Sequence, residues 1–532
     1  MTTGTMRYPI GIQTFERLRR DGYVYVDKTD LVWKLANTGT YAFLSRPRRF
    51  GKSLLTTTLK SYFEGKRELF EGLKIMQLEN EWQQYPVLHV DLSTAKGQDG
   101  PDRLRDRLNS MMSDISKDFG IALDADKFTP GAKFNSIIKS AYEHTGKQVV
   151  VLIDEYDAPL LEVLHEDTNL GSMRKVMQEF FQTLKASEAM IRFCFITGIT
   201  KFSQLSIFST LNNITNISMD PRYATICGIT DKEMHNNLDE GVVLLADTYR
   251  CSKDEMYDKL RTYYDGYHFA KNSEGVYNPF SLLSAMMKEE LDYYWFSSGT
   301  PLFLIEQMKR FKTDITSLDR IEALSTAFDQ PTENMQDALP LLYQSGYLTI
   351  KDYEFASNTY TLSIPNQEVR VGFAQNLIYA YSNIRANDVQ IGFALKFWRA
   401  LQAKDLDLAM SELKAFLAGI PYVEGFKEKL KDVPTREGFY EYTLYLIFSM
   451  LNTFVRTQVK CHGGDIDMVV FMPDTTYVIE FKVKDTAETA LRQIEEKGYA
   501  KPYQTEGRAV VKVGVSFDTD SWTVKEYLIS RA

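Results

Sequence analysis

Residues 41–53 read YAFLSRPRRFGKS, and LLTTTLKSYFEG follows at 54–65. The first five residues have the apolar and aromatic character of a buried strand, and the last segment repeats apolar residues at helical spacing. A strand, a loop that ends in Gly-Lys-Ser and then a helix is the context that a phosphate-binding loop requires, because backbone amides at a helix N-terminus bind an anion. The segment therefore predicts a nucleotide-binding α/β domain.

The residues of this loop have predicted roles in nucleotide binding. Lys52 would neutralise phosphate charge, and the Ser53 hydroxyl would ligate Mg²⁺. The general pattern begins with glycine, but Arg46 occupies that position. The arginines either stabilise a triphosphate or pair with acids such as Asp157 and stiffen the turn. The predicted nucleotide contacts are Arg46, Pro47, Arg48, Arg49, Phe50, Gly51, Lys52 and Ser53.

A second segment, QVVVLIDE at 148–155, predicts the acidic partner of the loop. Its apolar residues form a strand that delivers Asp154 to the edge of a sheet, where it would hold Mg²⁺ through water, and Glu155 would orient or deprotonate the attacking water. The alternative is two surface acids that end a strand. A further apolar run at 190–198 ends at Thr197; this residue or Thr200 would sense the γ-phosphate, or it only caps the strand.

The wider pattern predicts several domains. Apolar runs at 41–45, 85–93, 148–155 and 190–198 alternate with helical patterns, which indicates a parallel sheet covered on both faces. From about residue 226 the pattern is helical, until 345–366 reads as two strands around a polar turn, in a winged-helix-like or lid module. The predicted division is 1–225, 226–370, a helical connector at 371–430, and an α/β domain at 431–532.

Composition narrows the class of protein. A chain of 532 residues with 44% hydrophobic and 25% charged residues is an ordinary globular protein of several domains. No apolar run is long enough to span a membrane and the start lacks a secretory signal, so cytoplasm is the expected location. The four scattered cysteines support neither a zinc site nor a disulfide framework. The net charge of −9 argues against nonspecific coating of nucleic acid.

Near the C-terminus, GGDIDMVVFMPDTTYVIEFKV at 463–483 predicts a hairpin of two alternating strands around a turn at 473–476. Closing the hairpin on that turn would place Asp467 across from Lys482 and diagonally near Glu480. Two carboxylates and a lysine suit phosphodiester hydrolysis with Mg²⁺ or Mn²⁺ held by the acids. The alternative is a solvated face of alternating charges. The polar residues that share this face are Asp465, Asp467, Glu480, Lys482 and Lys484.

The N-terminal motifs, in order, resemble the bacterial predicted AAA-like ATPase family. They include YVYVDKT, SRPRRFGKSLL, VLIDEYDAPL, TGITKFSQLS and YYDGYHF, and the match covers about residues 7 to 370. In that family the loop begins S-R-P-R-R-F-G-K-S, so Arg46 is a family trait. The resemblance implies ATP as ligand and places Asp27 near the site. It marks Tyr264-Asp265-Gly266-Tyr267 as a family feature, makes Arg222 one option for an arginine finger, and leaves a homo-oligomer open.

The C-terminal hairpin resembles the restriction-endonuclease-like PD-(D/E)XK nuclease superfamily. The pattern D…(D/E)-x-K carries over to Asp467, Glu480 and Lys482 as catalytic residues, with both acids as metal ligands. Gln493 and Tyr499 resemble the Gln/Tyr element that follows in RecB-like members, and Glu437 or Glu441 is an option for a further ligand. Asp465 departs from the pattern, because the family usually has arginine there; a third acid either raises metal affinity or indicates a changed site.

Together, the two resemblances imply a protein that binds and hydrolyses ATP and couples this to a Mg²⁺-dependent nuclease acting on DNA, in defence or mobile-element biology. One alternative is a nucleotide-switched binding or scaffold protein whose nuclease-like domain does not cleave. Another makes the ATPase the whole activity, with the C-terminal fold serving as packing.

Overall fold

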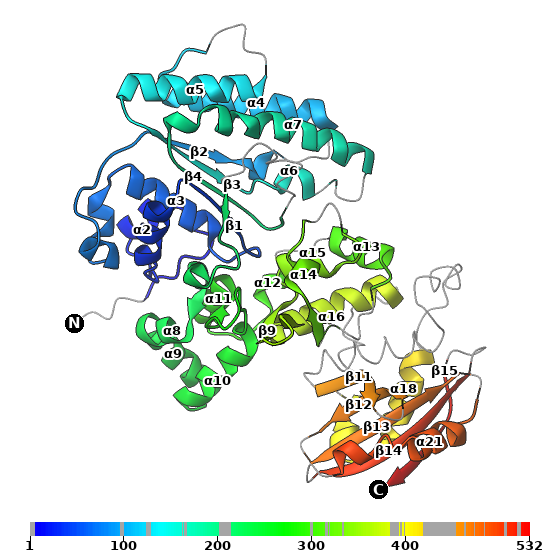
Figure 1. Ribbon diagram of the computed structural model, residues 1–532. Coiled ribbons are helices and arrows are strands. Elements are labelled where there is room, and N and C mark those ends of the chain that lie inside the picture. Colours follow the sequence, from blue (N-terminus) through cyan, green and yellow to red (C-terminus); the bar gives the residue numbers. More distant parts are fainter. Residues whose placement is uncertain are drawn as a thin grey trace. The chain divides into compact units, whose positions relative to one another are not determined.

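A computed structural model gives the fold of the chain (Figure 1). It describes residues 6–95, 100–123, 129–161, 163, 167–201, 214–297, 302–313, 318, 320–331, 335–382, 393, 396–397, 399–418, 454–461, 464–472, 474–483, 485–504, 508–518 and 523–531. The chain divides into two compact units. The first comprises 1–295, 301–307 and 322–366, and the second comprises 296–300, 308–321 and 367–532. The four domain boundaries expected from sequence stay predictions.

The first unit is built around a five-stranded parallel sheet with the order β2-β3-β4-β1-β5. All four strands expected from sequence are present, and the two-residue β5 was not predicted. Because β4 lies between β1 and β3, its C-terminal end separates the phosphate-loop strand from the acidic strand. The strands are β1 (Tyr41–Ser45), β2 (Val87–Asp91), β3 (Val149–Asp154), β4 (Ile191–Gly198) and β5 (Thr215–Asn216).

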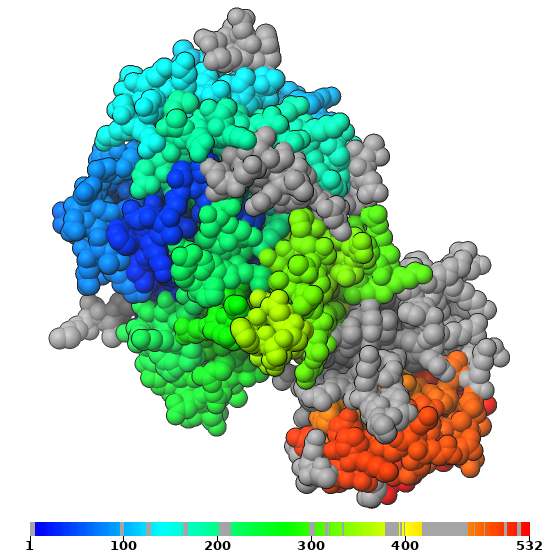
Figure 2. All heavy atoms as spheres, in the orientation of Figure 1, coloured from blue at the N-terminus to red at the C-terminus, as the bar shows by residue number. Residues whose placement is uncertain are grey.

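Helices cover both faces of this sheet, as predicted. Helix α3 (Lys52–Phe63) packs on one face, and α4 (Gly100–Asp118), α5 (Pro130–Thr145) and α7 (Asp167–Ala186) form a layer on the other (Figure 1). In Figure 2 this layer forms the upper surface of the unit. The remaining elements of this part are α1 (Phe15–Arg20), α2 (Thr29–Thr38), α6 (Ala158–Leu161), η1 (Arg67–Phe70), η2 (Lys74–Gln77), η3 (Leu92–Thr94), η5 (Glu188–Met190) and η6 (Pro221–Tyr223).

The chain from 229 to 363 is mostly helical and ends in the expected hairpin. Strands β9 and β10 pair antiparallel around a turn in which Asn358 has φ of 53°, and β8 joins them in a three-stranded sheet. The winged-helix assignment itself stays a prediction. The elements are β6 (Ile229–Thr230), α8 (Asp231–Asn237), α9 (Asp239–Tyr249), α10 (Lys253–Tyr264), β7 (Val276–Tyr277), α11 (Pro279–Lys288), α12 (Tyr294–Ser297), α13 (Leu302–Arg310), β8 (Ile321–Ala323), α14 (Ser325–Phe328), α15 (Leu339–Gln344), β9 (Thr349–Glu354) and β10 (Thr359–Ser363).

The second unit carries a five-stranded mixed sheet, β11-β12-β13-β14-β15, in which only β13 and β14 are parallel. The three strands expected from sequence are present, whereas β11 and β15 were not predicted. Helix α21 packs on β13 and β14. The elements are α16 (Gln367–Ser382), α18 (Leu406–Ala418), β11 (Phe454–Cys461), β12 (Gly464–Phe471), β13 (Thr475–Lys482), α21 (Ala487–Glu496), η10 (Lys501–Tyr503), β14 (Ala509–Asp518) and β15 (Thr523–Arg531).

Within the described ranges, no helix combines the length and the apolar character that a bilayer crossing needs.

Candidate functional site

The loop between β1 and α3 has the backbone form that a phosphate cradle needs. Gly51 is the N-cap of α3 with φ of 88°, a left-handed conformation that favours glycine, and Arg49 is also left-handed at 68°. The Lys52 ammonium donates to the carbonyls of Arg46 and Pro47 at 2.9 and 3.0 Å. Burial lowers the pKa of Lys52, and the charges of Asp154 and Glu155 oppose this shift.

The predicted magnesium ligands lie together at the sheet edge. Asp154 is 3% exposed, and a hydrogen bond from the Ser53 side chain lowers its pKa against the larger effect of burial, which raises it. A hydroxyl and a carboxylate are hard oxygen ligands of the kind that Mg²⁺ takes. Glu155 has φ of 51°, a strained conformation for a non-glycine residue, and burial raises its pKa. These residues therefore fit a nucleotide-bound Mg²⁺.

The end of β4 is held by side-chain contacts that the sequence left open. The Thr197 hydroxyl donates to the Leu44 carbonyl at 2.8 Å and is fully buried. Asp157 accepts from the Thr200 amide and hydroxyl at 2.7 and 2.8 Å and from the Ile199 amide at 3.0 Å. Both threonine hydroxyls thus have protein partners, which favours the capping alternative, and the γ-phosphate contact stays a prediction.

Within the described residues the loop arginines do not pair with Asp157, the acid named as an example, and the choice between a triphosphate contact and a stiffened turn stays a prediction. Arg46 is 1% exposed and donates to backbone carbonyls, and the Arg49 guanidinium lies 4.6 Å from the Phe280 ring centroid. Arg48 is exposed, and its carbonyl accepts from the Trp295 indole at 3.3 Å. Asp157 instead contacts the end of β4 through Oδ2.

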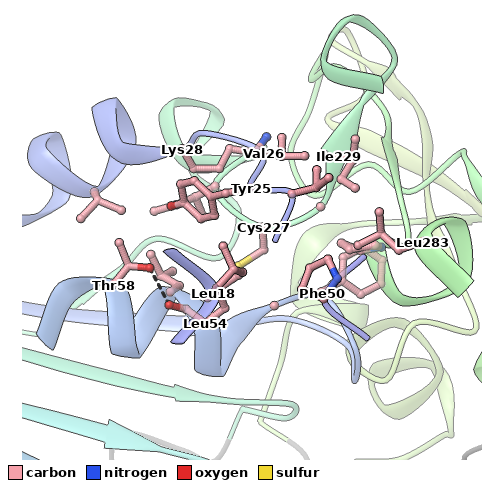
Figure 3. A pocket seen from close by; sticks show the side chains of 18 residues that line it. Leu18, Tyr25, Val26, Lys28, Phe50, Leu54, Thr58, Cys227, Ile229 and Leu283 are labelled. Carbon is pink, nitrogen blue, oxygen red and sulfur yellow. Dashed lines mark hydrogen bonds between the residues drawn. The ribbon is translucent and has the colours of Figure 1, made fainter. Parts of the chain in front are cut away.

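Beside the loop lies an apolar pocket of about 100 Å³ that the sequence did not predict (Figure 3). Its walls come from three segments far apart in the chain, at 24–28, 50–58 and 226–229, with Pro279 and Leu283. Gly51 belongs to the wall, so the pocket adjoins the predicted phosphate cradle. The one related signal in the sequence was the VDKT motif, which the family resemblance placed near the nucleotide site.

Two neighbouring residues of the VDKT motif, Asp27 and Lys28, make different contacts. Asp27, implied by the resemblance to lie near the site, accepts from the Thr29 amide and hydroxyl and from the Lys74 amide, so it anchors the start of α2. Lys28 lines the pocket instead, and its ammonium pairs with Glu233 at 2.5 Å. Of these two residues, Lys28 is therefore the one that lines the pocket.

Two further family features have structural contacts. Tyr267 of the Tyr264–Tyr267 motif packs edge-on against Phe50 of the loop, with ring centroids 4.8 Å apart. Arg222 is exposed and binds both oxygens of Asp220 through Nε, each at 3.0 Å. The finger role of Arg222 stays a prediction.

Asp91, at the end of β2, is an acid that the sequence analysis missed. It is the direct neighbour of Asp154 in the parallel register, and its charge contributes to the raised pKa of Asp154. The signal was the strand-ending pattern VDLS, which repeats the apolar-strand-then-acid form of the 148–155 segment. Its side chain accepts from the Ser93 amide at 2.9 Å.

At the C-terminal hairpin, the predicted register is wrong by two residues. The ladder pairs Met468 with Ile479 and Phe471 with Thr476, which puts Asp467 opposite Glu480 rather than opposite Lys482. The turn closes one residue earlier than expected, with the Met472 amide donating to the Thr475 carbonyl. A shift of two residues keeps every side chain on its face, so the predicted grouping of Asp467, Glu480 and Lys482 survives.

The three residues of the predicted nuclease motif are brought together around Glu480. Lys482 donates to Glu480 at 3.1 Å, Gln493 of α21 donates to the same oxygen, and Asp467 accepts from the Phe481 amide at 2.7 Å. Gln493 also reaches the Tyr499 hydroxyl at 3.4 Å. The predicted Gln/Tyr element therefore contacts the acid directly.

Glu480 is buried, which argues against the solvated-face alternative. It is 1% exposed, and burial together with the charge of Asp467 raises its pKa to about 7. Its second oxygen, Oε2, is buried with no hydrogen-bond partner among the described residues. A buried carboxylate oxygen without a partner, beside a second carboxylate, fits the ligand set of Mg²⁺ or Mn²⁺.

Each predicted metal site contains two protein ligands. Among the residues that the structure covers, no three His, Cys, Asp or Glu side chains gather as a metal site. Glu437, Glu441 and Lys484 lie outside the described residues, and of Asp465 only the backbone is described, in register with Lys460. The choice between the two consequences of Asp465 therefore stays open.

Comparisons with known proteins agree with both family resemblances. Residues 9–208 match the family described as "Predicted AAA-ATPase", and residues 435–527 match the "PD-(D/E)XK nuclease superfamily". A relative from Azotobacter chroococcum mcd 1, described as "Uncharacterized protein in vnfD 5'region", is 34% identical over 98% of both chains.

A solved STAND protein with a tetratricopeptide repeat sensor from Pyrococcus horikoshii is 11% identical, with a TM-score of 0.22 over 80% of this chain and 53% of that one. The close relative and the two matched regions place the chain plainly: it belongs to the family of the Azotobacter protein, with a Predicted AAA-ATPase region followed by a PD-(D/E)XK nuclease superfamily region.

Proposed function

We propose that the first unit binds and hydrolyses ATP on the loop at 46–53. The observation that carries this is the left-handed turn at Gly51 that leads into Lys52 and Ser53 at the start of α3, with the buried Asp154 close enough for both side chains to lower its pKa. Ser53 and Asp154 would hold Mg²⁺, which would neutralise phosphate charge. Lys52 binds the β- and γ-phosphates, and Glu155 orients or deprotonates the attacking water.

The pocket beside Gly51 supports a base site for the same nucleotide. Its volume of about 100 Å³ is below the roughly 300 Å³ of a small-ligand site, so it suits a ring whose sugar and phosphates remain outside. Apolar side chains dominate its wall, and no acid is among its lining residues. Guanine carries amino and imino donors that an acidic group would accept, so this lining favours adenine.

Calorimetry tests this proposal with ATP, GTP and tripolyphosphate. Wild type is expected to bind ATP more tightly than tripolyphosphate, because the base adds contacts, and more tightly than GTP. Lys52→Ala is expected to weaken ATP binding by about 10- to 100-fold, the value of a hydrogen bond to a charged group. Absence of ATP binding to folded wild type would overturn the proposal.

We propose that the second unit is a metal-dependent nuclease that acts on DNA. Asp467 and Glu480 are suited to hold Mg²⁺ or Mn²⁺, which supplies an activated water and stabilises the leaving oxygen. Lys482 is placed to position the nucleophile and to offset phosphate charge, since it already contacts Glu480. Gln493 keeps the Glu480 carboxylate oriented. The burial of Glu480 supports this reading over a surface ion pair.

Cleavage of supercoiled and linear DNA tests the nuclease and its control by ATP. Wild type is expected to cut with Mg²⁺ or Mn²⁺, and Asp467→Asn and Glu480→Gln are expected to abolish cutting. Glu495→Gln is a matched control on α21, because Glu495 pairs with Lys512 away from the site. If ATP regulates the nuclease, Lys52→Ala will lose the difference between cutting with and without ATP.

A second function rests on Asp465, which replaces the family arginine. In that case the second unit recognises DNA or a protein without cleaving it, and the nucleotide acts as the switch. Nucleotide-dependent retention of intact DNA would support it, and metal-dependent cutting abolished by Asp467→Asn would exclude it. A cytoplasmic role in defence or on mobile elements is proposed on the family resemblance alone.

A further inference from the structure

Arg46 has unusual surroundings for the first residue of a phosphate-binding loop. Its Nη1 donates to the carbonyls of Ser45 and Ser218 at 2.9 and 2.8 Å, and its Nη2 donates to the Tyr223 carbonyl at 3.2 Å. The guanidinium carbon lies 4.1 Å from the centroid of the Phe269 ring. A charged group that is 1% exposed is thus held by three carbonyls and an aromatic face.

The same aromatic residue is contacted by the other end of the loop. Phe50 packs edge-on against Phe269, with centroids 5.3 Å apart, and against Tyr267. Pro47 is pressed against the Gly346 backbone, where an added Cβ would lie 2.7 Å from the proline ring. The outer face of the loop therefore rests on residues 267–269 and 346, which belong to the helical part of the first unit.

Arg46 also connects this support to the phosphate side of the loop. Its backbone carbonyl accepts from the Lys52 ammonium at 2.9 Å, while its side chain donates to the Ser218 carbonyl. Glycine at this position in other loops lets the backbone take its form freely, at a cost in chain entropy. An arginine anchored at three carbonyls instead fixes the position of one carbonyl that holds Lys52.

We propose that Arg46 is the positioning residue of the phosphate-binding loop: its guanidinium, seated on Phe269 and bound to the Ser218 and Tyr223 carbonyls, holds the loop in its nucleotide-binding form. This inference rests on the proposed ATP site. It assigns Arg46 a support role and not a phosphate contact, because the guanidinium is enclosed by protein and both of its Nη atoms already donate to backbone carbonyls.

The sharpest test restores the general motif. Arg46→Gly recreates the glycine of the common pattern, so a reading from the motif alone expects unchanged or improved binding. We expect the reverse: the dissociation constants for ATP and ADP rise by about tenfold or more. The KM for ATP rises in parallel, while kcat stays within about threefold, because Asp154 and Glu155 are untouched.

Arg19→Lys is the matched control. Arg19 also donates to two backbone carbonyls, those of Leu69 and Glu71, and neither of these residues belongs to the loop. It is expected to leave ATP binding unchanged. Arg46→Lys covers the case in which Arg46→Gly fails to fold, with an expected rise in KM between wild type and Arg46→Gly. A purely structural role would lower the active fraction, and so kcat, without moving KM.

The outcomes separate the two proposals. If wild type binds ATP and both Arg46 variants keep its KM, the positioning role is overturned and the ATP site stands. If folded wild type binds no ATP, both fail.

Discussion

Lys52 and Lys482 both lie beside carboxylates, but they are held in different ways. Lys52 donates to carbonyls of its own loop, and the nearby acid Asp154 accepts from the Glu155 amide. Lys482 donates directly to Glu480, the acid with which it is proposed to work. The first lysine is therefore held by backbone groups, whereas the second contacts its acid directly in addition to the Phe481 carbonyl.

This difference determines what each site depends on. In the first unit a left-handed turn and a helix start fix the lysine, so its position follows from the main-chain path. In the second unit the buried carboxylate of Glu480 is contacted by Lys482 and Gln493, and the proposed metal ion would offset its charge. We expect the first site to be sensitive to changes in catalytic groups and the second to pH, metal and packing.

The largest expected effect is at Glu155. Glu155→Gln removes the group that orients or deprotonates water but keeps its size, so ATP turnover is expected to fall by about 10²- to 10⁴-fold. ATP binding should persist, because Lys52 and Ser53 are unchanged. Steady-state hydrolysis together with calorimetry measures both quantities.

Glu188→Gln provides the control, since Glu188 is an exposed acid in η5, before β4 begins. Turnover in Glu155→Gln that matches this control would show that Glu155 is not the catalytic base.

The next effect sharpens the contrast through pH. Burial raises the pKa of Glu480 from 4.5 to about 7, so the folded unit favours the protonated form. Without divalent metal, the stability that this group contributes is full below pH 4.5 and is lost as pH rises through about 7. Mg²⁺ binds the ionised form, so Mg²⁺ should raise the melting temperature more at pH 8 than at pH 5.5.

Thermal unfolding at the two pH values, with and without Mg²⁺, measures this difference. Glu480→Gln cannot ionise and should remove it. An equal Mg²⁺ effect at both pH values in wild type would mean that Glu480 does not bind the ion.

The two sites also differ in how much of their structure could be predicted from the sequence. The strands at 41–45 and 148–155 and the Gly-Lys-Ser start of α3 were predictable, because continuous apolar runs and a short motif are local signals. The contacts of Arg46 were not, since Ser218 and Phe269 are more than 170 residues away along the chain. The pocket could not be predicted from the sequence for the same reason, because its walls come mainly from three segments that are far apart along the chain.

In the second unit the face was predictable and the register was not. Strand periodicity fixes which side chains share a face, and this grouped Asp467 with Glu480 correctly. The turn around Asp474 can close in two ways. The two closures give strand registers that differ by two residues, so each keeps the same side chains on the same face. The burial of Glu480 depends on α21, so the alternation of charges alone could not distinguish a site from a solvated surface.

The smallest expected effect compares one glycine in each unit. At Gly51 an added Cβ would meet nothing within 4 Å, so Gly51→Ala costs only the left-handed backbone, about 1–2 kcal/mol of unfolding free energy. At Gly514 of β14 the Cβ would lie 2.4 Å from the Ala487 carbonyl oxygen and 2.7 Å from the Leu491 amide of α21. Backbone on both sides must move, so Gly514→Ala costs about 1–3 kcal/mol.

The two glycine variants should differ in function even where their stabilities are similar. Displacing α21 moves Gln493 away from Glu480, so Gly514→Ala is expected to reduce DNA cleavage and leave ATP turnover unchanged. Gly51→Ala should do the opposite, because it alters the start of α3 next to Lys52. Measuring both activities well below the melting temperature of each variant separates these effects from unfolding. Full cleavage by a folded Gly514→Ala would show that the second site does not depend on the packing of α21. The different ways in which Lys52 and Lys482 are held would then not predict a different sensitivity of the two sites to packing.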